Sequence, residues 1–153
     1  MKKKLLFIFI PILSYSQSKK DQIETLKYYL TGENTFEKKS LEINYNNSMD
    51  SFYINMNSKM PPTNTVYVYN TSCRFKTSDI NEIGSYYKDK ILIMDILLSG
   101  DKCEHTSVKN NLAPEVKVNY LLNFSVTDLS VEEKYNFEDS VSKLFNKSIT
   151  KKN

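Results

Sequence analysis

The chain has 153 residues, 40% of them hydrophobic, and its 21 basic side chains slightly outnumber its 18 acidic ones. This length and apolar content are typical of one globular domain with a buried core. The basic excess comes from Lys2, Lys3 and Lys4, and the chain has only one arginine. No clustered positive charge therefore remains to neutralise phosphates, and nucleic-acid binding is not expected.

The first 16 residues have the three parts of a secretory signal peptide. The basic start precedes an apolar run over residues 5–13, and small residues stand at Ser14 and Ser16. The run is about nine residues long, whereas a membrane-spanning helix needs about twenty. We predict cleavage after Ser16, export to the periplasm or the medium, and a mature chain without a stable membrane span. A buried N-terminal helix or a membrane anchor is the alternative.

Residues 17–150 are predicted to form a single domain, followed by a basic tail at 151–153. Its first element is a helix over residues 18–30, in which apolar residues recur three and four apart, at Ile23, Leu26 and Leu30. Ser18 is a candidate cap for this helix, and Gly32 lies just past its end.

Strands are predicted to follow. Residues 41–45 and 52–56 alternate apolar and polar side chains around turn-forming residues 46–50, which indicates an antiparallel hairpin. Residues 65–75, rich in Val, Tyr and Thr, predict a third strand. Residues 77–87 predict a short helix with Ile80, Ile83 and Tyr87 on one side, although Gly84 weakens it by about 1 kcal/mol.

The most apolar stretch of the mature chain is residues 90–98, which predict a strand covered on both faces. A helix that ends at Gly100 is the alternative. The polar residues 99–114 predict a long loop. Residues 115–127 then alternate over thirteen positions and predict one long strand, whose apolar face carries Val116, Val118, Tyr120, Leu122, Phe124 and Val126.

The last element is an amphipathic helix within residues 131–149, beginning at Val131 or as late as Phe137. Its apolar stripe comprises Phe137, Val141, Leu144, Phe145 and, if the helix extends so far, Ile149. The order of elements predicts an α+β fold: a mostly antiparallel sheet of about five strands with helices packed on one face.

Cys73 and Cys103 are the only cysteines. In an exported protein an even cysteine count predicts a disulfide, which would close a loop of about 30 residues and stabilise the fold by roughly 3–4 kcal/mol. A reactive thiol or two inert buried thiols are the alternatives.

Catalytic residue types gather only around residues 95–105. Asp95 lies within an aliphatic run, so it is paired, exposed or raised in pKa, and a raised pKa would suit acid–base chemistry. An exposed position on a sheet face is the favoured interpretation. Glu104 and the sole histidine, His105, lie nearby, but a solvated loop histidine is the favoured interpretation. Three or four metal ligands are not available, and no metal site or cofactor is expected.

Tyrosine is abundant, with eleven copies and no tryptophan. Tyr67 and Tyr69 share one face of the predicted third strand. If Val66 and Val68 face the core, these tyrosines lie outside with Tyr53 and offer a surface to an envelope protein, a peptide or a glycan. The alternative is that the tyrosine face is the core face.

Together these observations favour an exported, non-enzymatic binding or interaction module of the cell envelope. The competing hypothesis is a small hydrolase that uses Asp95, Glu104 and His105.

Overall fold

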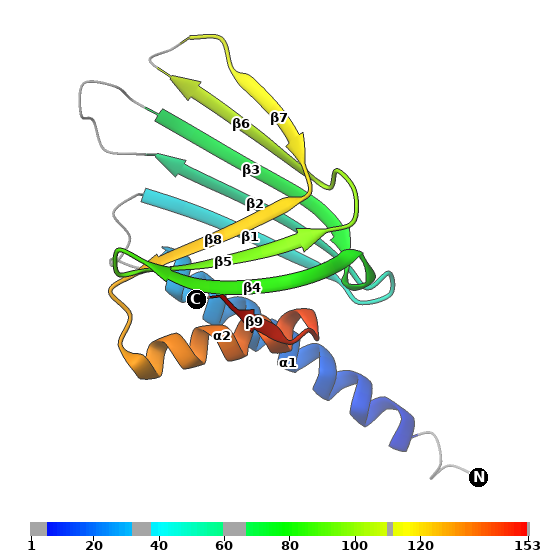
Figure 1. The fold of residues 1–153 in the computed structure, drawn as a ribbon. Coiled ribbons are helices and arrows are strands. Elements are labelled where there is room, and N and C mark those ends of the chain that lie inside the picture. The colour runs from blue at the N-terminus through cyan, green and yellow to red at the C-terminus, as the bar shows by residue number, and fades with distance from the viewer. Residues whose placement is uncertain (1–5, 32–37, 60–66, 110–111, 153) are drawn as a thin grey trace.

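The computed structural model describes residues 6–31, 38–59, 67–109 and 112–152. Within these residues the chain forms two helices and nine strands in two sheets (Figure 1). The predicted α+β class, with a five-stranded antiparallel sheet and one disulfide, is confirmed. The structure adds a second sheet of four strands.

The five-stranded sheet is antiparallel throughout. Its strands, in spatial order, are β1 (Lys38–Asn46), β2 (Ser51–Lys59), β3 (Tyr67–Lys76), β6 (Cys103–Lys109) and β7 (Glu115–Asn119). The predicted hairpin is formed by β1 and β2, and the predicted third strand is β3. The hairpin turn is closed by Asn46, whose Oδ1 accepts hydrogen bonds from the backbone N–H groups of Ser48 and Met49.

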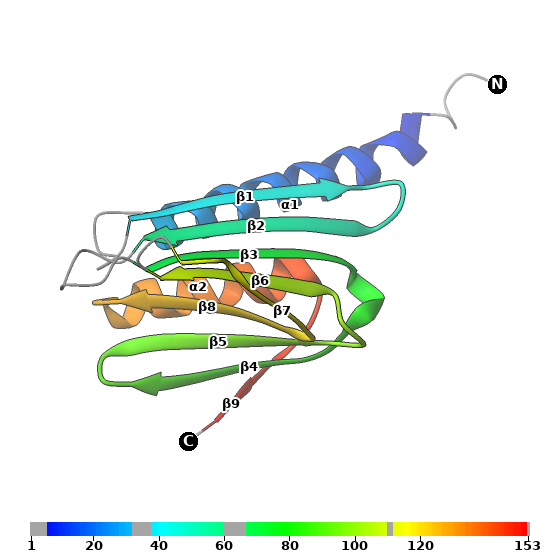
Figure 2. The same ribbon diagram turned by 90° about the horizontal axis from the view of Figure 1, so that it is seen from above.

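The four-stranded sheet lies across part of the first (Figure 2). Its order is β8 (Leu121–Thr127), β5 (Ile91–Leu98), β4 (Ile80–Lys88) and β9 (Ile149–Lys151), with β9 parallel to β4. The strand interpretation of residues 90–98 is therefore correct and the helix alternative is wrong. Alternate residues of β5 are fully buried, and the others are half-buried. The predicted basic tail begins at Lys151, the last residue of β9.

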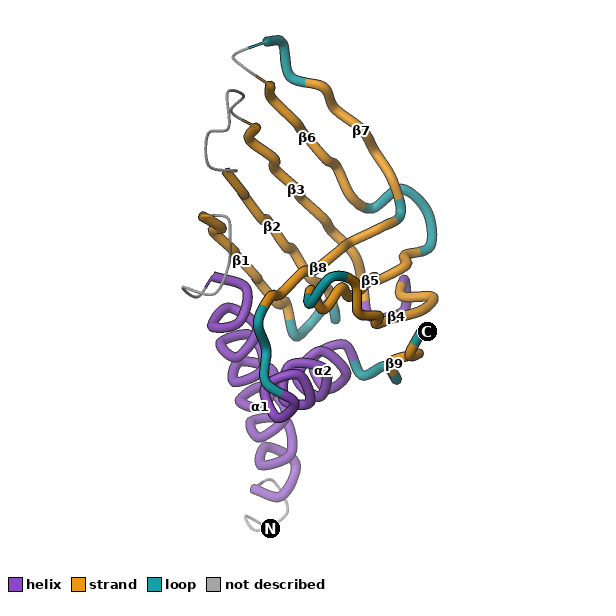
Figure 3. The backbone as a smooth tube through the Cα atoms, turned by 60° about the vertical axis from the view of Figure 1, so that its left-hand side comes forward, coloured by secondary structure: helices purple, strands orange, loops and turns teal. Residues whose placement is uncertain are grey.

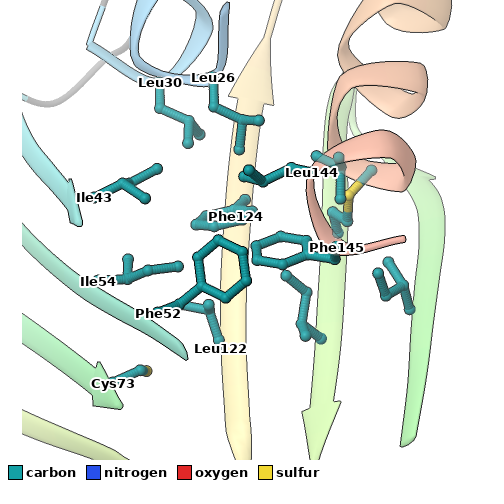
Figure 4. Packing of buried hydrophobic residues seen from close by; sticks show 14 of the residues in the cluster. Leu26, Leu30, Ile43, Phe52, Ile54, Cys73, Leu122, Phe124, Leu144 and Phe145 are labelled. Carbon is teal, nitrogen blue, oxygen red and sulfur yellow. The ribbon is translucent and has the colours of Figure 1, made fainter. Parts of the chain in front are cut away.

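Helices α1 (Leu6–Thr31) and α2 (Val131–Phe145) pack against each other on one side of the five-stranded sheet (Figure 3). The core lies between the helices and the two sheets, where side chains from all of these layers meet (Figure 4). Phe52 at its centre has ring contacts with Phe75 and Phe145. The predicted apolar faces of both helices are buried, comprising Ile23, Leu26 and Leu30 of α1 and Phe137, Val141, Leu144 and Phe145 of α2.

Both helices differ from their predicted bounds. α1 begins at Leu6 rather than at Ser18, which lies inside the helix and does not cap it. α2 begins at Val131, where Ser130 caps it, and ends at Phe145 because Asn146 adopts the left-handed conformation with φ 50°. Ile149, predicted at the end of this helix, instead pairs with β4.

The predicted helix over residues 77–87 is wrong. One 3₁₀ turn, η1 (Thr77–Asp79), leads directly into β4. The pairing with β5 shifts between Ile80 and Glu82, and this irregularity brings Ile80 and Ile83 into the core although they are three apart. Two buried residues three apart are also what one face of a helix would give, which is why the sequence predicted a helix here. Gly84 lies beneath the side chain of Lys152, whose Cε would be 2.8 Å from an added Cβ.

The predicted loop over residues 99–114 is also wrong, because it contains β6. The predicted strand over 115–127 is two strands, β7 and β8, which belong to different sheets. Only the second half of its apolar face is buried. Val116, Val118 and Tyr120 are 54–57% exposed, whereas Leu122, Phe124 and Val126 are in the core.

Candidate functional site

A disulfide fixes the centre of the candidate site. Cys73 on β3 and Cys103 on β6 are buried, directly opposite each other in the sheet, and covalently linked, with their Cα atoms 4.1 Å apart. The predicted bridge is confirmed. The next pair on the same face is Thr71 with His105, followed by Tyr69 with Ser107. The bridge therefore fixes the alignment of the side chains beyond it.

These side chains open into a pocket of about 250 Å³ between the two sheets. Its apolar part comes from the end of α1, from β1 and β2, and from the edge strand β8: Leu30, Leu41, Met56 and Phe124. The polar part comes from Ser40, Asn57, Ser58, Tyr69, Thr71, His105, Asn123 and Ser125. Apart from the titratable ring of His105, the lining residues carry no charge. A pocket with this lining suits an uncharged ligand that has an apolar part.

His105 is a half-buried strand residue, so its predicted place in a solvated loop is wrong. Its Nε2 lies 3.0 Å from Asn119 Oδ1 and 3.1 Å from the carbonyl oxygen of Leu121. Asn119 Oδ1 also accepts the backbone N–H of Leu121 at 2.9 Å, which fixes the orientation of the amide. Nε2 therefore faces two acceptors and carries a hydrogen.

The other ring nitrogen, Nδ1, lies 2.9 Å from Thr71 Oγ1. In the neutral ring Nδ1 accepts the hydrogen of the Thr71 hydroxyl. Both nitrogens are thus engaged, and the ring joins β3 and β6 to the point where the chain crosses from β7 to β8. Thr71 and Asn119 were not predicted as partners of His105, because β6 itself was not predicted.

The other two catalytic candidates lie elsewhere. Asp95 on β5 is half-buried, and its Oδ1 accepts a hydrogen bond of 2.6 Å from Asn123 Nδ2. Asn123 lines the pocket but Asp95 does not. Glu104 is exposed and, as the neighbour of His105 along a strand, it lies on the opposite face of the sheet. The structure does not bring the three residues together.

The tyrosines do not form one surface. Tyr69 is 38% exposed and lies on the inner face of the five-stranded sheet, the face that carries Cys73 and lines the pocket. Tyr53 lies on the outer face, beside Arg74. The side chain of Tyr67 is outside the described part of the structure. Tyr69 therefore belongs to the pocket, and Tyr53 to a different region.

Among the described residues, no group of three or more His, Cys, Asp or Glu side chains is placed to hold a metal ion. In the same part of the chain, no helix is both long and apolar enough to cross a membrane.

Comparison with known proteins adds no functional information. No model of a known protein family matches this chain, and searches of curated proteins and of solved structures gave no match either.

Proposed function

We propose that this chain is an exported, non-enzymatic binding module and that the pocket between its sheets is the ligand site. The observation that carries the proposal is the pocket itself, which is lined by both apolar side chains and neutral hydrogen-bonding groups. Tyr69, one of the predicted binding residues, contributes to the polar lining.

The lining defines the chemistry of the ligand. A carboxylate or ammonium group would lose its hydration in this pocket without gaining an opposite charge, which is costly. An uncharged polar group can instead bond to amides and hydroxyls such as Asn123 and Thr71, while an apolar tail contacts Met56 and Phe124. The ligand we propose is therefore a small neutral amphiphile.

Titration of the isotope-labelled protein with octan-1-ol, followed by NMR, tests this proposal. We expect saturable shifts of backbone amides at Tyr69, Thr71 and Ser125, and much weaker shifts with octanoate, which has the same chain and a charge. Met56→Trp should fill the pocket and weaken binding at least tenfold. Met49→Trp is the matched control, because Met49 is 60% exposed in the hairpin turn. Unsaturable shifts, or equal affinity of the two variants, would contradict the proposal.

Export rests on two observations. The first turns of α1, where the predicted cleavage point lies, extend away from the rest of the molecule in all three ribbon and tube views (Figures 1–3). The disulfide fits an oxidising compartment. Intact-mass measurement of protein recovered from the periplasm or the medium should give a chain that begins at Gln17. A mass that includes residues 1–16 would contradict export by cleavage.

The competing hydrolase function has one geometric feature in its favour. Thr71, His105 and Asn119 form a chain from hydroxyl to imidazole to amide, the arrangement of a nucleophile, a base and an orienting group. An assay with p-nitrophenyl esters decides between the two functions. Ester hydrolysis that is lost in both Thr71→Val and His105→Gln, with the fold retained, would favour the hydrolase. We expect no turnover above background.

A further inference from the structure

The five-stranded sheet has two edge strands, β1 and β7, and they are covered differently. At the first edge, α1 packs against β1, so that Ile43 is buried, and the exposed side chains of β1 include Glu42 and Asn44. At the second edge, β7 pairs with β6, and no strand in the described part of the chain pairs with its other side (Figures 1 and 3). The backbone N–H and C=O groups on that side are therefore available to a further strand.

The outer face of β7 is apolar, unlike the exposed face of β1. Val116 and Val118 lie on this face, with Glu104 of β6 directly opposite Val118, and the two valines are 54% and 57% exposed. Leu112 and Tyr120, which flank the strand in the sequence, are 64% and 56% exposed. Large apolar side chains thus gather along one short edge of the sheet. Such a concentration is typical of a surface that contacts another protein.

The inner face of β7 carries two opposite charges. Glu115 and Lys117 are neighbours on this face, and Lys117 Nζ lies 2.9 Å from Glu115 Oε1. Their side chains are 64% and 71% exposed, so the ion pair is screened by water and contributes little to the fold. The same two groups can also pair with a neighbouring strand that presents the opposite order of charges. An antiparallel copy of β7 presents that order.

Symmetry and charge together select one alignment of two β7 strands. In an antiparallel pair centred on Val116, Glu115 of each copy lies opposite Lys117 of the other, and Val118 lies opposite Pro114. A shift by two residues in either direction places Glu115 opposite its own counterpart, or Lys117 opposite its own, which is destabilising. A shift by one residue places each valine opposite a charged side chain.

We propose that β7 is a docking edge for a second copy of this chain, which adds its own β7 antiparallel and joins the two five-stranded sheets into one. The paired segment is short, because Pro114 lacks an N–H and the chain leaves the sheet after Asn119. A contact of this size is typical of a weak dimer that depends on concentration. The inference is independent of the pocket, since no residue of β7 lines it.

Sedimentation velocity of the full chain tests the proposal from micromolar to millimolar protein concentration. We expect a monomer that dimerises as the concentration rises. Hydrogen exchange measured by NMR should slow, at high concentration only, for the β7 amides that point away from β6. Dimers without this protection would overturn the proposal. So would a chain that stays monomeric, and that result would leave the edge to a strand of a different protein.

Charge variants test the alignment of the two strands. Glu115→Lys and Lys117→Glu each place like charges opposite one another in a homodimer and should weaken self-association by roughly tenfold or more. An equimolar mixture of the two variants should dimerise again, because two lysines of one copy then face two glutamates of the other. A mixture that associates no better than the separate variants would overturn the proposed pairing.

A lysine at the centre of the edge distinguishes β7 from other routes of association. Val116→Lys places two ammonium groups opposite each other and should abolish dimerisation, since charged side chains block the pairing of edge strands. Tyr135→Lys is the matched control, because Tyr135 is 68% exposed on α2, and it should leave dimerisation unchanged. Near-ultraviolet circular dichroism verifies the fold of each variant. Equal self-association of the two variants would overturn the assignment of the edge.

Discussion

At the scale of single residues, a buried lysine joins the two helices. Lys19 on α1 is only 3% exposed, and its Nζ donates a hydrogen bond of 2.9 Å to the carbonyl oxygen of Leu144 near the end of α2. The same ammonium lies 4.3 Å from the centroid of the Tyr45 ring. The ammonium group interacts favourably with the negative, C-terminal end of the α2 dipole, and it donates a hydrogen bond to a carbonyl group in the last turn of that helix.

Lys19→Met should destabilise the fold, because methionine fills most of the space but cannot bond to the Leu144 carbonyl. We expect a loss of about 1–3 kcal/mol in the free energy of unfolding, measured by urea denaturation. The control is Lys20→Met, one residue away and exposed, which should change stability by no more than about 0.5 kcal/mol. Coinciding transitions of the two variants would rule out a stabilising role for the buried ammonium.

Ser130 is the second residue whose role can be measured directly. Its Oγ accepts the backbone N–H of Glu133 at 3.2 Å, and its own N–H donates to Glu133 Oε2 at 2.9 Å. Hydrogen bonds from the side chain and the backbone of Ser130 lower the pKa of the Glu133 carboxyl. The stabilisation linked to this carboxylate is therefore present above its unfolded pKa and is lost as the pH falls through the lowered folded pKa.

Ser130→Ala should raise the pKa of Glu133 toward its ordinary value and cost about 1 kcal/mol of stability through loss of the helix cap. An NMR pH titration of the Glu133 side-chain carboxyl measures the first effect, and urea denaturation measures the second. Ser148→Ala serves as a control outside both helices. An unchanged pKa in Ser130→Ala would show that the capping box does not form in solution.

At the scale of elements, the sequence predicted those with a clear apolar period. The hairpin and α2 have a regular apolar period, β5 is a continuous apolar run, and β3 is rich in Val, Tyr and Thr; all of them exist. β4 was mistaken for a helix because its pairing irregularity gives Ile80 and Ile83 a helical spacing. β6 was missed for the opposite reason. Apart from Cys103, its residues are half-buried or exposed, so it has no alternating apolar face. From the polar inner face of β6, His105 lines the pocket.

The disulfide compensates for this weak apolar face by fixing β6 to β3. Cys73→Ala combined with Cys103→Ala should lower the free energy of unfolding by roughly 3–4 kcal/mol, because the unfolded chain regains the freedom of the closed loop. Denaturation of the wild-type protein with and without a reducing agent provides the matched comparison and should show the same loss. A double variant as stable as the oxidised protein would mean that β6 is held by its backbone pairing alone.

At the scale of the whole molecule, the pocket exists because one continuous pattern is divided between two sheets. Residues 115–127 alternate apolar and polar side chains with one exception, Leu121, and the chain leaves the five-stranded sheet after Asn119 and enters the other at that residue. β8 then crosses the inner face near β1 and β2, while β6 and β7 continue beyond it (Figure 1). The pocket is lined by the middle of β8 and by the facing residues of β1, β2, β3 and β6. The apolar–polar alternation of a segment cannot predict such a crossing, because it does not specify which sheet each half of the segment joins.

Packing against the rest of the molecule determines how much of α1 is required for a stable fold. The first core residue that the structure describes in this helix is Ile23, preceded by the buried Lys19, while the initial turns extend past the other elements (Figure 2). A chain that begins at Gln17 should therefore unfold with the same free energy as the full chain, within about 0.5 kcal/mol, when measured by urea denaturation. A chain that begins after Leu26 lacks two buried core residues and should lose several kcal/mol, since each large-to-small change in a core costs about 2–5 kcal/mol. If removal of residues 1–16 were as damaging as the longer deletion, the start of α1 would be part of the folded domain rather than a removable leader.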